Sequence, residues 1–169
     1  MKSTKKIEVY FVDNDLLFLR EINEKFSIER PYRLHTKVSV TEFLSELQDK
    51  TENNFIMVVI NDMIISHGLN TKSVVEILPM IKGIDKEISV IVLTDNANRE
   101  LKLTSSDLRP DAYIKKDNSM YFKLPPTINK IVCNYELKKS KRKLQIVIVI
   151  AIAIIAITIV YFATASIIG

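Results

Sequence analysis

Residues 55–62 read Phe-Ile-Met-Val-Val-Ile-Asn-Asp, six apolar residues followed by an amide and a carboxylate. An unbroken apolar run of this length is typical of a parallel strand that is covered on both faces. Residues 88–93 (ISVIVL) form a second such run, and residues 7–12 (IEVYFV) a third strand candidate. Weaker strands are expected at 33–38 and 111–114. Helical patterns separate the five strands, which predicts an α/β fold: a doubly wound, five-stranded parallel sheet.

The helices between these strands are predicted from apolar residues that recur at a spacing near 3.6 and from end signals. They are expected at 16–26, at 41–47 with Thr41 as its cap, at 70–82 with an end near Gly83, at 96–108, and at 127–137 after Pro125-Pro126.

The charge of the chain is concentrated in one place. The 169 residues carry a net charge of +4, but Lys138, Lys139, Lys141, Arg142 and Lys143 hold five of the 24 basic residues. Residues 1–137 therefore have 19 basic against 20 acidic residues. A near-neutral body does not favour binding to nucleic acid. One cysteine and two histidines argue against a disulfide framework and a zinc site.

The last part of the sequence predicts a membrane anchor. Residues 144–168 contain no charged residue. As a helix they would extend roughly 37 Å, and the hydrocarbon core of a bilayer is about 30 Å thick. Because basic residues stay on the cytoplasmic side, the block at 138–143 places the N-terminal part in the cytoplasm. We therefore expect a cytoplasmic domain at 1–137, a basic juxtamembrane segment at 138–143, and a single C-terminal transmembrane helix at 144–168, as in a tail-anchored protein.

Polar side chains follow four of the five strands. These segments are Asp13-Asn14-Asp15, Asn61-Asp62, Thr94-Asp95 and Lys115-Lys116-Asp117. Ligand sites of open α/β sheets lie at the carboxyl ends of the strands. Carboxylates suit Mg²⁺, and a hydroxyl with an ammonium suits phosphoryl oxygens. A carboxylate beside a metal can also act as a nucleophile and form an acyl phosphate.

These segments resemble those of a response-regulator receiver domain of the CheY-like, flavodoxin-like type, over about residues 7–137. Asp13-Asn14-Asp15 resembles the acidic cluster after the first strand of the family, and residues 62–66 (DMIIS) its phosphoacceptor segment. Residues 92–95 (VLTD) resemble the segment with the switch hydroxyl. Residues 111–117 (DAYIKKD) resemble the segment with the switch aromatic and the lysine.

The resemblance implies a role for each matched residue. Asp62 is the expected phosphoacceptor. Thr94 and Lys116 are expected to bind the phosphoryl group. Before Asp62 is phosphorylated, Lys116 is expected to pair with its carboxylate. Tyr113 and Thr94 are the expected switch residues, and Tyr113 is the aromatic one of the two.

The resemblance also implies a magnesium site. The expected ligands of a weakly bound Mg²⁺ are Asp13, Asn14, Asp62 and the carbonyl of Ile64. Asn14 stands where a second acidic residue is common, which removes one charge from the site, and Asp15 is expected to compensate in part.

Other departures leave an alternative open. Ser66 replaces the usual proline, Arg109-Pro110 replaces a common Gly-Ala pair, and Asn61 stands where an apolar residue is usual. A register with Asn61 at the acceptor position would make the domain unable to accept a phosphoryl group. We prefer Asp62, because Met63-Ile64-Ile65 then fits the apolar positions that follow the acceptor.

These features predict a membrane-tethered receiver of a phosphorelay, a signalling protein and not an enzyme, at the bacterial inner membrane. Its expected partners are a histidine kinase or phosphotransfer protein upstream and an unidentified protein effector, with homodimerisation left open. The alternative is a pseudo-receiver that serves as a membrane-anchored adaptor or structural subunit. A haloacid-dehalogenase-type phosphatase is disfavoured, because Leu17 stands where Thr or Val is usual and no acidic pair follows Lys116.

Overall fold

The computed structural model describes residues 7–26, 32–50, 54–65, 71–95 and 109–168. The side chains of residues 49, 50, 64, 65, 71, 72 and 159–168 lie outside this description. The chain divides into two compact units, Met1–Pro125 and Pro126–Gly169. The first unit contains the sheet, and the described part of the second is helical.

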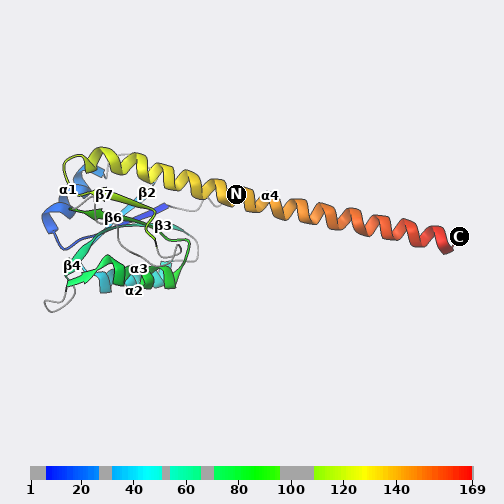
Figure 1. The fold of residues 1–169 in the computed structure, drawn as a ribbon, viewed down its shortest axis with the longest axis horizontal. Helices are drawn as coiled ribbons and strands as arrows, with labels where there is room; N and C mark the ends of the chain where they lie inside the picture. The colour runs from blue at the N-terminus through cyan, green and yellow to red at the C-terminus, as the bar shows by residue number, and fades with distance from the viewer. Residues whose placement is uncertain (1–6, 27–31, 51–53, 66–70, 96–108, 169) are drawn as a thin grey trace. The chain divides into compact units, whose positions relative to one another are not determined.

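The sheet of the first unit confirms the predicted five-stranded parallel architecture (Figure 1). Its strands are β1 (Ile7–Val12), β2 (Tyr32–Lys37), β3 (Phe55–Asn61), β6 (Ser89–Thr94) and β7 (Ala112–Lys115). Their order across the sheet is β2-β1-β3-β6-β7, and every neighbouring pair is parallel. The chain thus builds to one side of β1 and then to the other. A reversal of this kind is where ligands bind in open α/β sheets.

Helices cover both faces of this sheet (Figure 1). On one face lie α2 (Val40–Lys50) and α3 (Val74–Ile84), whose buried residues Phe43, Leu47 and Leu78 belong to the same core cluster as Tyr10 and Val58. On the other face lies α1 (Leu16–Phe26), and the rings of Phe11 and Phe26 are 6.0 Å apart. Because β3 is central and covered on both sides, all its residues from Phe55 to Ile60 are buried.

Two helix starts differ from the prediction. The second helix begins at Val40, and the hydroxyl of Ser39, not that of Thr41, accepts the hydrogen bond from the amide of Glu42 (3.5 Å). The third helix begins at Val74 with Ser73 as its cap, so residues 71–73 are not helical. They form β5 (Thr71–Ser73), which pairs antiparallel with β4 (Met63–Ile65). Serine is a strong cap because its oxygen accepts from an otherwise unpaired amide.

The last helix also starts earlier than predicted. It runs from Met120 to Ile168 as α4, and its start is fixed by Asp117, whose carboxylate accepts hydrogen bonds from the amide (2.9 Å) and hydroxyl (2.5 Å) of Ser119. These hydrogen bonds lower the pKa of Asp117, and the bond from the Ser119 hydroxyl has the larger effect. Pro125 and Pro126 therefore lie inside the helix, where the prediction placed them before its first turn.

Two other predictions have a different outcome. The helix expected at 96–108 lies outside the described residues. Among the residues whose side chains are described, no helix combines the length and the apolar character needed to cross a bilayer. The span at 144–168 is not confirmed and stays a prediction.

We expect residues 1–137 to fold without the rest of the chain, because the described core clusters on both faces of the sheet are built within this range. A purified fragment of residues 1–137 should unfold in one cooperative thermal transition, followed by circular dichroism. A fragment ending at residue 119 is the control. It lacks Met120 and Leu124, which are both buried, and should melt at a lower temperature. Aggregation of the longer fragment with no transition would contradict the prediction.

Candidate functional site

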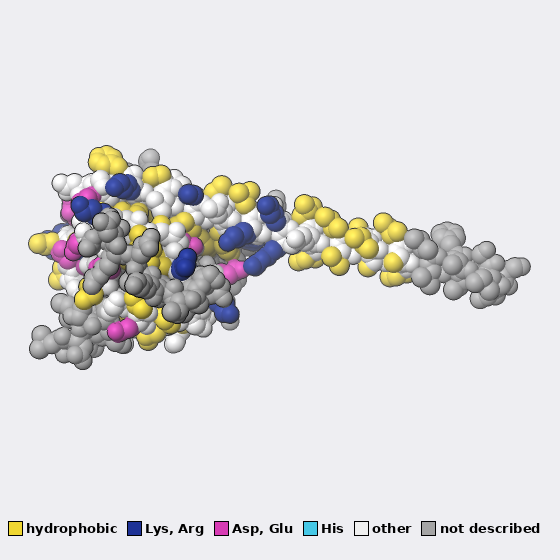
Figure 2. Space-filling model, viewed as in Figure 1, with side chains coloured by type: hydrophobic (Ala, Val, Ile, Leu, Met, Phe, Trp, Pro, Cys, Tyr) yellow, Lys and Arg dark blue, Asp and Glu magenta, His cyan; other side chains and the backbone are white. Residues whose placement is uncertain are grey.

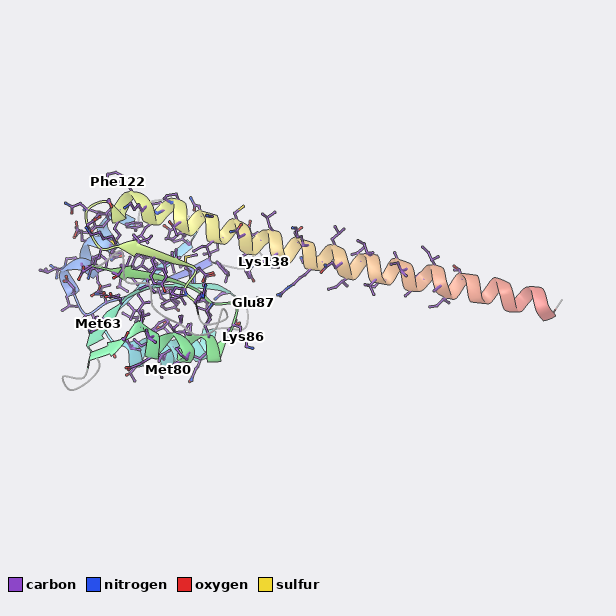
Figure 3. The ribbon with its side chains drawn as sticks, in the orientation of Figure 1. Met63, Met80, Lys86, Glu87, Phe122 and Lys138 are labelled. Carbon is purple, nitrogen blue, oxygen red and sulfur yellow. The ribbon has the colours of Figure 1, made fainter. Side chains whose placement is uncertain are left out.

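The candidate site lies at the carboxyl end of the parallel strands. Figure 3 labels Met63, which follows Asp62 at the end of β3, and Lys86 and Glu87, which precede β6. They lie at opposite ends of the first unit, so the end near Met63 is the carboxyl edge. Asp13, Asp62 and Lys116 each lie one residue beyond a parallel strand at this edge, and Thr94 is the last residue of β6.

The strongest contact at this edge joins Asp13 to Lys116. The Lys116 Nζ lies 2.6 Å from Asp13 Oδ2, and Asp13 is only 3% exposed. The other oxygen of Asp13, Oδ1, accepts a hydrogen bond from the amide of Asp15 at 3.0 Å. The ammonium of Lys116 also lies 4.3 Å from the centre of the Phe18 ring, which favours a cation at this position. The predicted pairing of Lys116 with Asp62 stays a prediction, and the ion pair with Asp13 is an additional contact of the same ammonium.

Asp62 and Thr94 form a second buried pair. The Thr94 hydroxyl donates to Asp62 Oδ2 over 2.7 Å, and the two residues are 3% and 8% exposed respectively. Backbone bonds hold Asp62 in place, since its amide donates to Leu93 O (2.8 Å) and its carbonyl accepts from Val74 N (2.9 Å). The carboxylate is therefore held between the end of β6 and the start of α3. The hydroxyl predicted to bind a phosphoryl oxygen is thus a direct neighbour of the predicted acceptor.

The side chains of Asn14 and Asp15 form hydrogen bonds with the backbone, and their expected roles at the metal site stay predictions. The side-chain amide of Asn14 donates to the carbonyl of Val38 at 3.2 Å. The carboxylate of Asp15 accepts from the amides of Leu17 (3.0 Å) and Phe18 (3.1 Å), which makes it the cap of α1. One oxygen of Asp15, Oδ1, thus stabilises the start of α1.

The positions of Tyr113 and Ile64 do not decide whether these residues have their predicted roles. Tyr113 lies in β7 opposite Val92 and is 41% exposed. Ile64 lies in β4, two residues after Asp62. Neither position tests the switch role of Tyr113 or the metal-binding role of the Ile64 carbonyl, and both stay predictions.

Sequence reasoning missed two contacts of this site. Asn61 donates from Nδ2 to Asp13 Oδ2 at 3.2 Å, and Phe18 lies below the ammonium of Lys116. The first had a visible signal, because a polar Asn61 at the end of an apolar strand must find a partner when it is partly buried. The second had none, because Phe18 also fits the apolar pattern of α1.

The carboxylates at this edge suit a hard cation such as Mg²⁺, and we expect the site to bind it weakly. Asp13 and Asp62 supply carboxylate oxygens on neighbouring strands, which is the chemistry that Mg²⁺ prefers. Among the described residues, however, no group of three or more acidic, histidine or cysteine side chains is arranged to hold a metal ion. Both oxygens of Asp13 already accept hydrogen bonds. The residues therefore fit Mg²⁺ only as a site with two carboxylates.

Several solved structures that are similar to this chain contain receiver domains. A response-regulator receiver domain protein from Clostridium thermocellum has 20% sequence identity and a TM-score of 0.63, over 78% of this chain and 98% of that chain. The response regulator DrrB of Thermotoga maritima, an OmpR/PhoB homologue, has 25% identity and a TM-score of 0.60, over 77% of this chain and 54% of that one.

The chain has the receiver fold.

A third similar structure is RcsB of Salmonella enterica, bound to a promoter in the presence of the phosphomimetic BeF₃⁻. It has 16% identity and a TM-score of 0.61, over 77% of this chain and 62% of RcsB. This chain thus matches only about half to three fifths of DrrB and RcsB. No family model matches the sequence, and a search of curated proteins finds no match.

The capping role of Asp15 can be tested against a role in metal binding. Asp15→Ala should destabilise the protein by about 1 kcal/mol, the usual cost of losing a cap. Asp15→Ser is the matched control, because serine caps helices but is a poor metal ligand. Asp15→Ser should keep most of the stability in urea unfolding. Equal losses of stability in both variants would contradict the capping role.

Proposed function

We propose that this protein is a receiver module of a phosphorelay, which accepts a phosphoryl group on Asp62 and signals through contacts with other proteins. The observation that carries the proposal is the buried hydrogen bond between Thr94 and Asp62, next to the ion pair of Lys116 with Asp13. A nucleophilic carboxylate, a hydroxyl donor and an ammonium thus share the carboxyl edge of one sheet. The similarity to receiver structures supports the same function.

The reaction proposed for Asp62 is a transfer between a phosphodonor and its carboxylate. A carboxylate oxygen of Asp62 forms a bond to phosphorus, the bond from phosphorus to the donor breaks, and the leaving group keeps that electron pair. The product is an acyl phosphate. The Thr94 hydroxyl, which already lies 2.7 Å from Asp62 Oδ2, can then donate to a phosphoryl oxygen. A bound Mg²⁺, held by Asp13 and Asp62, would offset negative charge on the transferring group.

Chemical labelling tests this proposal. The full chain, incubated with acetyl phosphate and Mg²⁺, should gain one phosphoryl group that hydroxylamine removes, as measured by mass spectrometry. Asp62→Asn should lose the label completely. The matched control is Asp95→Asn, because Asp95 also follows a strand at this edge but is exposed, and it should be labelled like the wild type.

The absence of any label would favour the pseudo-receiver. In that case Asp62→Asn should bind partner proteins as the wild type does, and the domain would act as an adaptor or structural subunit.

We also propose that α4 tethers this module to a membrane, with a single pass and with residues 1–137 in the bacterial cytoplasm. The support comes from the sequence of 144–168, which lacks charge, and from the exposure of its apolar side chains. Leu144, Val149 and Ile157 are 61%, 65% and 69% exposed. Figure 2 shows hydrophobic side chains along α4, beyond a group of basic ones. Apolar side chains on several faces of one helix are costly in water and favourable in lipid.

The tether predicts a fixed orientation. A reporter that is active in the cytoplasm should work at the N-terminus, and one active in the periplasm should work at the C-terminus. Replacing Lys138, Lys139, Lys141, Arg142 and Lys143 by Gln should loosen or invert this orientation, because positive charge resists translocation. Replacing five exposed basic residues away from this block, Arg20, Arg33, Lys86, Lys115 and Lys123, by Gln changes the charge by the same amount and should not. Recovery of the wild type outside the membrane fraction would contradict the tether.

A further inference from the structure

Asn61 occupies an unusual place for an amide side chain. It is the last residue of β3, the central strand, directly after six buried apolar residues. In the sheet it pairs with Leu93 of β6, and its predecessor Ile60 pairs with Val12 of β1. Asn61 is therefore next to Asp13, and its Nδ2 donates to Asp13 Oδ2 over 3.2 Å.

The same oxygen of Asp13 accepts a second, shorter bond. Lys116 Nζ lies 2.6 Å from Oδ2, and the amide of Asp15 lies 3.0 Å from Oδ1. An ionised carboxylate offers about four lone-pair positions, and three donors occupy this one. A cation that binds through Oδ2 must compete with Lys116 and with Asn61 at once.

The two competitors act differently. Lys116 neutralises the charge of Asp13, so a cation that displaces it must replace an ion pair in a site where Asp13 is only 3% exposed. Asn61 is neutral and adds no charge. The N–H of Asn61 restrains the orientation of the Asp13 carboxylate, because it holds Oδ2 in the position where Lys116 contacts it.

We propose that Asn61 is a positioning residue: it holds Asp13 on Lys116 and thereby lowers the affinity of the site for a divalent cation. The inference rests on the proposed function, which assigns Asp13 to the metal site. It goes beyond that function because it assigns to Asn61 the control of metal affinity, a property that neither carboxylate sets alone.

Direct measurement of Mn²⁺ binding tests this role. Mn²⁺ is used as a paramagnetic probe for the magnesium site, and free Mn²⁺ is counted by electron paramagnetic resonance with the full chain in mild detergent. Asn61→Leu removes the donor at similar size and should bind Mn²⁺ about three- to tenfold more tightly, the effect of losing one competing hydrogen bond. Asn61→Asp removes the donor and adds an anionic oxygen, so it should bind more tightly still.

Asn54→Leu is the matched control. Asn54 also donates to a buried carboxylate, that of Glu8 at 3.5 Å, but it precedes β3 at the other end of the strand. Its replacement should leave Mn²⁺ binding unchanged. Thermal unfolding of each variant verifies that it is folded, and Asn61→Ala, which removes the donor without adding a charge, provides the test if Asn61→Leu does not fold.

The outcomes separate this inference from the proposed function. Binding by Asn61→Leu that is equal to or weaker than that of the wild type would overturn the role of Asn61, even if Asp62 is labelled by acetyl phosphate. So would the absence of measurable Mn²⁺ binding in the wild type and in both Asn61 variants. A missing label on Asp62 together with tighter Mn²⁺ binding by Asn61→Leu would overturn the proposed phosphoryl transfer and leave the role of Asn61 intact.

Discussion

The ion pair between Lys116 and Asp13 is the contact on which the carboxyl edge of the sheet depends. It joins the segment after β7, the edge strand, to the segment after β1, across the ends of β3 and β6. Asp13 is buried, so the loss of Lys116 would leave an uncompensated charge inside the protein, at a cost of about 3–5 kcal/mol. Asn61, Phe18 and the amide of Asp15 are all arranged around this pair. Next to this pair, the hydroxyl of Thr94 donates to Asp62.

The sheet and the identity of the edge residues could be predicted from the sequence because both follow from local patterns. Buried parallel strands need long apolar runs, and residues 55–60 and 88–93 are such runs. The ends of these strands then place Asp13, Asp62, Thr94 and Lys116 at one edge. Helix starts were less predictable, since Ser39 and Thr41 are both good caps and only the backbone geometry decides between them. The start of the last helix was predicted too late for a similar reason. Proline is common in the first turn of a helix, but Pro125 and Pro126 lie within α4.

The pairing of side chains within the site could not be predicted. Lys116 has two acidic neighbours in sequence reasoning, Asp13 and Asp62, and spacing alone does not say which one it meets. The contact with Asp13 depends on the register of β7 against β6, where Thr94 pairs with Lys115 and so fixes the position of Lys116. Nor did the sequence reveal the short β4–β5 ribbon between Asp62 and α3. Its residues 63–65 and 71–73 are too few to carry a strand pattern.

The long sequence separation of the ion pair has a consequence for the order of events during synthesis. Asp13 and Lys116 are 103 positions apart, so most of the first unit leaves the ribosome before the ammonium exists. At elongation rates of about 5–20 residues per second, the acidic edge stays without its cation for several seconds. During that interval the carboxylates of Asp13 and Asp62, at the ends of β1 and β3, lack this counter-charge, and their negative charge opposes burial. Closure of this edge is therefore a late step in folding, which depends on the arrival of β7.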